Sequence, residues 1–220
     1  RSTLFPYTTL FRSISFEVDN PCHKFAAIGR LIAVQAWFGH GGCSVLLYNI
    51  YAPSGSRWEQ LKRKQLYDLL DAVTLDSVAR GQLPTVLLGD FNMTIEESPK
   101  IAQLLYNRTW CDTRNVAEPS MFNAPTCHVG PAQGSKIDHI FVSPALYDLS
   151  FNFQVTKIPT FKDHSQVSIK IKVPTPVQTR MSLRKPSCLQ HLHMPTQHDR
   201  IIPYQASQNF SRAIANSDID

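Results

Sequence analysis

The stretch Pro84–Asn92, PTVLLGDFN, decides the fold class and points to the chemistry. Its apolar run Val86–Leu88 predicts a short buried strand that runs into Gly89-Asp90-Phe91-Asn92. Asp90 and Asn92 are two residues apart, so an extended backbone places both side chains on the same face. A carboxylate and a carboxamide so placed can hold a water molecule and stabilise charge on a phosphoryl group. A simple turn at a strand end uses the same residue types, so this stretch alone leaves both interpretations open.

Strands and a helix alternate upstream of this stretch. Ile28–Phe38 and Cys43–Tyr51 are apolar runs on either side of a glycine-rich turn at residues 39–42, which predicts a β-hairpin. Arg57–Arg80 carries apolar residues at helical spacing and ends just before Gly81, which predicts an amphipathic helix.

The same alternation continues downstream. Glu96–Tyr106 is expected to form a second helix, and strands are expected at Ser135–Ser143, Ser150–Lys157 and Gln166–Val173. Because strands and helices are interleaved and a hairpin is present, the sequence predicts an α/β fold with mixed or antiparallel sheets.

A carboxylate interrupts one of the apolar strands. Asp138 lies within IDHIFVS, residues 137–143, and a carboxylate in such surroundings needs a partner. The adjacent His139 must point to the opposite face, so the partner has to come from elsewhere. Asp163-His164, just before the last strand, supplies a candidate, because a histidine held by a carboxylate suits acid–base chemistry at a phosphate. A solvent-exposed Asp-His turn is the alternative for that pair taken alone.

The composition limits the kinds of partner and the cellular setting that the protein can have. The 220 residues carry a net charge of +5, which permits a polyanionic partner without requiring one. No apolar run approaches the roughly 18 residues that suggest a membrane span. The five cysteines are scattered with no CxxC spacing, which favours reduced thiols and an intracellular setting.

Both ends of the chain differ from its middle. Residues 1–13, RSTLFPYTTLFRS, repeat Thr-Leu-Phe and can be back-translated into a string that resembles a common sequencing-library adapter. A signal peptide is the alternative, but Pro6 and several threonines interrupt its apolar part. We therefore expect residues 1–13 to pack against nothing, residues 14–173 to form the domain, and residues 174–220 to be a linker or a disordered tail.

Four motifs taken together are more specific than any one of them. Asn49–Pro53 (NIYAP), GDFN, IDHIFVS and the DHS-x-V that begins at Asp163 resemble the DNase I-like endonuclease/exonuclease/phosphatase superfamily in order and spacing. The resemblance covers Ile28–Val173 and is closest to apurinic/apyrimidinic endonucleases and to the endonuclease domains of non-LTR retrotransposons. It implies a four-layered α/β sandwich with two packed sheets.

The resemblance also implies catalytic roles for four residues. Asp90 would orient or activate the attacking water, and Asn92 would stabilise the pentacovalent phosphate. Asp138 would hydrogen-bond the catalytic histidine, which is His164.

Three further residues match binding positions. Tyr51 corresponds to a tyrosine that contacts the scissile phosphate, Thr126 to a substrate-facing threonine, and Asp163 to a carboxylate at the metal site. Lys162 stands where family members usually have serine, a change that affects the neighbourhood of the Asp-His pair without removing it.

The family's first motifs have no match in this sequence. Its Asn motif and its Gln-Glu motif, whose Glu is the main metal ligand, should lie upstream of Ile28, where Glu17 stands in a different context. The domain is therefore expected to be incomplete at its N-terminus, and no meaningful rate of DNA cleavage is expected from this chain.

The implied parent activity is hydrolysis of phosphodiester bonds with Mg²⁺ or Mn²⁺, with DNA as the substrate and a nuclear location if the protein is of retrotransposon type. No obligate protein partner is implied. Two alternatives remain: a phosphohydrolase of the same fold acting on inositol phosphates or lipids, and a non-catalytic remnant that binds nucleic acid or nothing.

Overall fold

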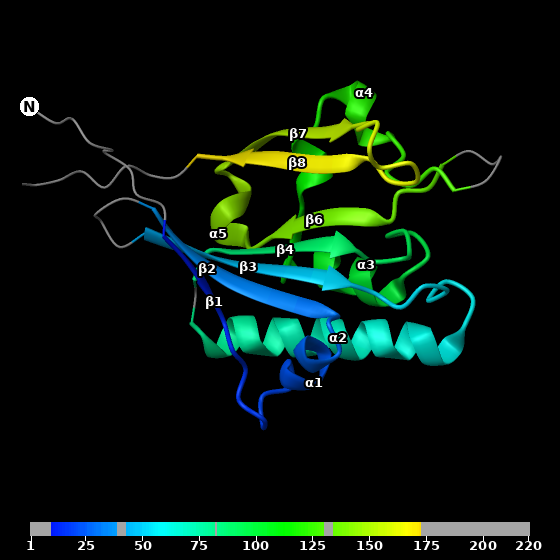
Figure 1. Ribbon diagram of the computed structural model, residues 1–220. Helices are drawn as coiled ribbons and strands as arrows, with labels where there is room; N and C mark the ends of the chain where they lie inside the picture. Colours follow the sequence, from blue (N-terminus) through cyan, green and yellow to red (C-terminus); the bar gives the residue numbers. More distant parts are fainter. Residues whose placement is uncertain (1–9, 39–42, 82, 130–133, 173–220) are drawn as a thin grey trace, which may run out of the picture. The chain divides into compact units, whose positions relative to one another are not determined.

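The structure is a computed structural model that describes residues 10–38, 43–81, 83–129 and 134–172 (Figure 1). All of them belong to the first of two units, Arg1–Val177. The expected linker or tail, residues 174–220, lies outside the described residues, as do residues 1–9.

The larger sheet has six strands in the order β1-β2-β3-β4-β6-β5. Their bounds are β1 Leu10–Ser13, β2 Leu31–Phe38, β3 Cys43–Tyr51, β4 Thr85–Asp90, β5 Cys111–Asp112 and β6 Asp138–Val142. Only the β3–β4 pair in this sheet is parallel, and the other neighbours are antiparallel. A parallel pair requires a crossover, and helix α2 (Gln60–Ala79) provides it.

Helices cover one face of this sheet (Figure 1). Alternate residues of β3, Leu46, Tyr48 and Ile50, join the main core together with the apolar side of α2. The side chains that α2 buries there include Leu66, Leu69, Leu70, Ala72 and Val73. Each large aliphatic side chain buried in this way contributes about 1.5–3 kcal/mol relative to an exposed one. The short α1 (His23–Ala27) and α3 (Pro99–Tyr106) add Phe25 and Ile101 to the same core.

A second sheet packs on the other face. It consists of β7 (Ser150–Thr156) and β8 (Gln166–Ile171) in antiparallel pairing. The strand residues whose side chains point to this second face of the large sheet form another apolar cluster with side chains of β8. The cluster includes Val45, Val86, Ile140, Val142, Val167, Ile169 and Ile171. The remaining short helices are η1 (Thr113–Val116), α4 (Pro119–Phe122) and α5 (Pro144–Tyr147).

The expected α/β fold with two packed sheets is confirmed, and the predicted hairpin, long helix and later strands are present, most of them with shorter bounds. The short elements α1, β5, η1, α4 and α5 were not predicted from the sequence. Two further differences concern α3 and the N-terminal segment. Helix α3 begins at Pro99 rather than at Glu96, because Ser98 caps it by accepting a hydrogen bond from the Ile101 amide and proline suits its first turn.

The expectation that residues 1–13 pack against nothing is wrong for Leu10–Ser13. These residues form β1, which pairs antiparallel with Val34–Trp37 of β2. Pairing with an open sheet edge uses main-chain groups and is therefore largely independent of sequence. The proposed adapter origin of the segment remains a prediction.

Candidate active site

A cleft of about 360 Å³ lies between the two sheets, where β3 and β4 end and β6 begins. Its walls include side chains that alternation directs toward the second sheet, beside the intervening residues Ile50, Gly89 and His139. The polar ones besides His139 are Asn49, Tyr51, Asp90, Asp138 and Ser165. The hairpin, the parallel pair and the last strand thus bring motifs from distant parts of the sequence to one place.

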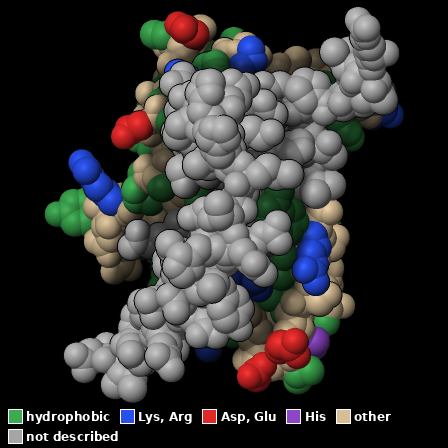
Figure 2. Space-filling view, turned by 90° about the vertical axis from the view of Figure 1, so that its left-hand side faces the viewer, with side chains coloured by type: hydrophobic (Ala, Val, Ile, Leu, Met, Phe, Trp, Pro, Cys, Tyr) green, Lys and Arg blue, Asp and Glu red, His purple; other side chains and the backbone are tan. Residues whose placement is uncertain are grey.

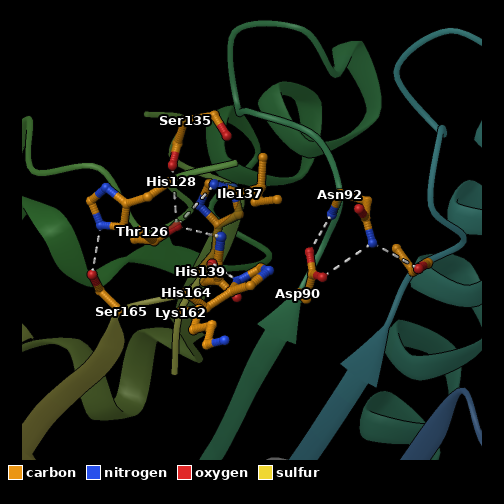
Figure 3. Close-up of polar contacts among 12 residues, drawn as sticks. Asp90, Asn92, Thr126, His128, Ser135, Ile137, His139, Lys162, His164 and Ser165 are labelled. Atoms are coloured by element: carbon orange, nitrogen blue, oxygen red, sulfur yellow. Dashed lines mark hydrogen bonds and ion pairs between the residues drawn. The ribbon is translucent and has the colours of Figure 1, made fainter. Parts of the chain in front are cut away.

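Asp90 and Asn92 form a closed local arrangement (Figure 3). The Asp90 carboxylate accepts hydrogen bonds from the Asn92 amide N–H at 2.8 Å and from Asn92 Nδ2 at 3.2 Å. Asn92 Nδ2 also donates to the carbonyl oxygen of Ala52 at 3.0 Å. Asn92 adopts φ 49°, a left-handed conformation that asparagine tolerates better than most residues. The turn therefore fixes both side chains, and both amide protons of Asn92 are engaged.

Gly89 allows β3 and β4 to approach closely at the edge of the cleft. Its φ is 137°, and a Cβ at this position would lie 1.9 Å from the Ile50 carbonyl oxygen. Only glycine is compatible with that geometry. The glycine of the GDFN motif is thus required by the backbone rather than by the chemistry.

Asp138 and His164 meet as the sequence predicts. Asp138 Oδ2 lies 3.0 Å from His164 Nδ1, with 18% of the aspartate and 39% of the histidine side chain exposed. The carboxylate is therefore sheltered while the ring remains accessible. The two residues lie on separate segments, so the contact depends on the junction that joins those segments.

That junction is built on Thr126–His128. The Thr126 hydroxyl accepts hydrogen bonds from the amides of Ile137 and Asp138 at 3.1 and 3.0 Å, and the Thr126 carbonyl accepts one from the Ser165 amide at 2.7 Å. The His128 amide donates to the Asp163 carbonyl at 2.7 Å, and its Nε2 lies 2.9 Å from Ser165 Oγ. This short segment connects the two chain stretches that carry Asp138 and His164.

These contacts change the role expected of Thr126. The side chain is completely buried, and its hydroxyl is occupied by main-chain amides. The geometry favours support of the Asp138 backbone over the substrate contact that the resemblance implied.

Asp163 also differs from its expected place. Its residue is exposed, and the group of potential metal ligands among the described residues consists of Asp90, Asp138 and His164, whose ligand atoms lie within 4.8 Å of one another. Asp163 contributes its main chain to the junction instead. Its neighbour Lys162 is likewise exposed, and its carbonyl accepts a hydrogen bond from Lys157 Nζ at 2.7 Å.

Electrostatics support a cation in this group. Burial is the main cause that raises the pKa of Asp90; the Asn92 amide opposes the shift, and the negative charge of Asp138 adds to it. A positive ion beside Asp90 would stabilise its ionised form, which burial disfavours most and the nearby charge of Asp138 disfavours further. The chain's donor set of two carboxylates and an imidazole therefore fits a divalent metal.

Tyr51 lies at the rim of the cleft with 48% of its surface exposed. Its hydroxyl is 3.4 Å from Ser54 Oγ, and the Arg30 guanidinium lies over its ring at 4.8 Å. Arg30 also donates to the carbonyls of Tyr51 and Ala52, at 3.4 and 3.3 Å. Tyr51 is therefore available to a ligand, as expected, and Arg30 adds a positive charge beside it that the sequence did not single out.

Several solved structures have a similar fold. The chain is similar to the 3'-5' exonuclease NExo from Neisseria meningitidis, with 22% identity and a TM-score of 0.52 over 66% of this chain and 65% of that one. It is also similar to an AP endonuclease from Archaeoglobus fulgidus, with 15% identity and a TM-score of 0.55 over 76% and 80% of the two chains. The endonuclease domain of TRAS1, a telomere-specific non-LTR retrotransposon, matches with 13% identity and a TM-score of 0.54 over 75% and 70%.

These likenesses show that the chain has the fold of endonuclease/exonuclease/phosphatase structures, as the motifs implied. It spans 65% of the length of the Neisseria exonuclease. No protein-family model matches the sequence, and a search of curated proteins finds no match either. Within the described residues, no helix is both long enough and apolar enough to cross a bilayer.

Proposed function

We propose that the cleft hydrolyses phosphodiester bonds of DNA with the help of a divalent metal ion, in the manner of a retrotransposon endonuclease. The observation that carries the proposal is the 3.0 Å contact between Asp138 Oδ2 and His164 Nδ1 beside Asp90. One potential ligand atom from each of these three residues lies within 4.8 Å of the other two. Residues separated by 74 positions in the sequence converge there, which a set of unrelated surface turns would not do.

The Asp138–His164 pair sets the protonation of the ring. When His164 Nδ1–H donates to Asp138, the neutral ring leaves Nε2 free to accept a proton or, once protonated, to donate to a phosphate oxygen. The partly exposed ring and the sheltered carboxylate suit this division of work. The Asp138 charge stabilises the imidazolium that forms.

Asp90 and Asn92 act on the attacking water and on the phosphate. Asp90 retains acceptor positions beyond those that Asn92 fills, so it can orient a water molecule. The Asn92 amide can stabilise developing charge on the phosphate by exchanging its hydrogen bond to Asp90 for one to a phosphate oxygen. The rigid turn keeps this exchange local.

Asp90 and Asp138 are the residues that would hold the metal, which we take to be Mg²⁺ or Mn²⁺, while the neighbouring His164 ring keeps Nε2 free for proton transfer. When bound, such an ion neutralises phosphate charge and lowers the pKa of bound water. Mg²⁺ prefers oxygen ligands and keeps several waters. Because the described residues offer two carboxylates, we expect weak binding and slow turnover.

DNA is the substrate class that similar structures suggest. A Neisseria structure similar to this chain, with a TM-score of 0.52 and 20% identity, is a 3' phosphatase bound to a product DNA hairpin. The net charge of +5 is compatible with a polyanion. At the margin of the face shown in Figure 2, the visible described basic and acidic side chains form no patch of one charge. We assign DNA contact to the cleft and its rim because the proposed catalytic residues lie there. The retrotransposon type would place the protein in the nucleus.

The test compares substrates under single-turnover conditions with protein in excess. Supercoiled plasmid, an inositol polyphosphate and sphingomyelin vesicles are each incubated with Mg²⁺ and, separately, with a chelator. From the sequence alone, the missing upstream motifs predict no meaningful cleavage by this chain. Because the cleft brings Asp90, Asp138 and His164 together, we propose instead slow nicking of the plasmid that requires Mg²⁺ and is measurable with protein in excess. Release of phosphate or phosphocholine without nicking would replace DNA by the alternative substrates, and no reaction on any of them would favour the non-catalytic alternative.

A further inference from the structure

A buried cation lies directly behind the cleft. Arg114, on η1, is 4% exposed and forms no ion pair with any carboxylate in the part of the chain that the structure describes. Burying a guanidinium costs several kcal/mol unless hydrogen bonds compensate it. Its contacts therefore indicate what it is for.

Those contacts connect the segment that carries Asp138 with the segment that carries Asn92. Arg114 Nη2 donates to the carbonyl oxygen of Asp138 at 3.0 Å and lies 3.0 Å from His139 Nδ1. A guanidinium has no acceptor, so Nδ1 must be the unprotonated nitrogen and Nε2 must carry the proton. Nε2 then donates to the carbonyl oxygen of Met93 at 3.1 Å. Arg114 and His139 thus join Asp138 to the residue that follows Asn92.

This link stands where the sheet can no longer hold the two segments together. The β4–β6 pairing ends at Asp90 opposite Asp138, and the Phe91 amide makes one more hydrogen bond, to the Ile137 carbonyl at 2.8 Å. After Phe91 the chain turns away through the left-handed Asn92. Without a further tie, nothing in the strand ladder fixes that turn relative to β6.

The link is also rigid. His139 is 1% exposed, its ring stacks on Phe141 with centroids 5.3 Å apart, and it meets Phe91 edge-on at 5.1 Å. A ring confined in this way can transmit position, because it has no room to rotate. Neither Arg114 nor His139 is among the residues that form the candidate metal group.

We infer that Arg114 and His139 are positioning residues, which set the separation of Asn92 and Asp138 across the cleft by linking the Asp138 and Met93 carbonyls behind it. The predicted effect on the nicking rate rests on the proposed function. The predicted effect on the position of Asn92 relative to Asp138 rests on the contacts alone. Geometry errors of about 1 Å can cost about 100-fold in rate, so a link of this kind affects turnover strongly without touching the substrate.

The experiment compares Arg114→Met, His139→Phe and the double variant. Each single variant leaves a buried polar side chain unpaired and should lower the unfolding temperature. The double variant removes both polar side chains and should recover part of that loss, but not all of it, because the Asp138 and Met93 carbonyls lose their donors. The nicking rate of the double variant should nevertheless stay on the order of 10- to 100-fold below wild type. The control is Tyr48→Phe, which removes a buried hydrogen bond to Asp76 that is not part of this link. It should lower the unfolding temperature and leave the rate per folded molecule unchanged.

A second readout is independent of activity and of metal. Hydrogen exchange of the Asn92 amide, which donates to Asp90 Oδ1 at 2.8 Å, should accelerate in the double variant and not in Tyr48→Phe. If wild type fails to nick DNA but Asn92 loses protection, the proposed function is wrong and the link is supported. If the double variant regains stability together with wild-type Asn92 protection, Arg114 and His139 only fill the core and the inference is wrong.

Discussion

Asp138 and His139 are adjacent in the sequence and show how differently the two faces of the large sheet use polar groups. Asp138 points to the second sheet and holds the exposed ring of His164. His139 points to the helices, where burial above all, and then the charge of Arg114, lower its pKa to about 3. The proposed chemistry is concentrated on the face where packing leaves a cleft. Buried polar side chains on the covered face are paired, and they support the fold and, through Arg114 and His139, the spacing of the cleft residues.

The covered face holds a second polar group that sharpens this contrast. Asp76 on α2 is 3% exposed and accepts hydrogen bonds from Tyr48, Asn20 and Arg80. It joins a strand, the N-terminal segment and the helix at a distance from the cleft. Outside the Arg114–His139 link, the comparison therefore predicts that variants on the cleft face change activity and that variants on the covered face change stability.

The largest effect should come from the cleft face. Asp138→Asn keeps the shape of the side chain but removes the charge that stabilises the His164 imidazolium, so nicking should fall by about 10²–10⁴-fold. The unfolding temperature should change little. Asp68→Asn, at an exposed aspartate of α2, is the matched control. If the Asp138→Asn protein nicks at the control's rate, the claim that the cleft face carries the chemistry is wrong.

The covered face should give the next largest effect, on stability alone. Asp76→Ala leaves Tyr48 and Arg80 without their buried acceptor and should lower the free energy of unfolding by about 3 kcal/mol. Urea denaturation measures this. Nicking per folded molecule should match wild type, and a specific loss of activity would show that the two faces are coupled.

Thr126 lies between these extremes, because it is buried and yet supports the cleft. Thr126→Val keeps the shape but leaves the amides of Ile137 and Asp138 unpaired, which should cost about 1–3 kcal/mol. The nicking rate should also fall, whereas Thr126→Ser, which retains the hydroxyl, should restore both. If valine and serine variants behave alike, the hydroxyl does not support Asp138.

The smallest effect is a pH dependence from Asp76. Burial alone would raise the pKa of Asp76, but hydrogen bonds from Arg80, Tyr48 and Asn20 outweigh it and hold the pKa below its usual range. The resulting stability is present above the ordinary aspartate pKa of about 3.9 and is lost as pH falls through the folded-state pKa. Thermal unfolding of Asp76→Asn should therefore depend less on pH below about 4 than that of wild type. Equal slopes would contradict this assignment.

The alternation of side chains along the strands and the order of the motifs predict much of the site. The positions of the remaining residues depend on the paths of the loops, which the sequence does not show. The period of two in β6 is enough to separate Asp138 from His139 and to send the former to His164. It gives no information about Thr126, whose burial depends on the junction with Ser165. Asp163 is exposed and lies outside the group of Asp90, Asp138 and His164, because the course of the loop and not the Asp-His spacing decides its place. Its role as a metal ligand stays a prediction.

Arg114 had no sequence signal at all. An arginine in a short 3₁₀ turn suggests a solvent-exposed residue, and only the contact with His139 reveals that it is buried. The unusual histidine inside an apolar strand was the one available clue, since such a ring needs polar partners on the covered side.

The central claim is that the His164 ring on the cleft face carries phosphodiester hydrolysis, and its most direct test is single-turnover nicking of supercoiled plasmid by His164→Ala in Mg²⁺. We predict a loss of at least about 100-fold relative to wild type, the lower range for a general acid–base group, with an unchanged unfolding temperature. A His164→Ala protein that nicks at the wild-type rate would contradict the account.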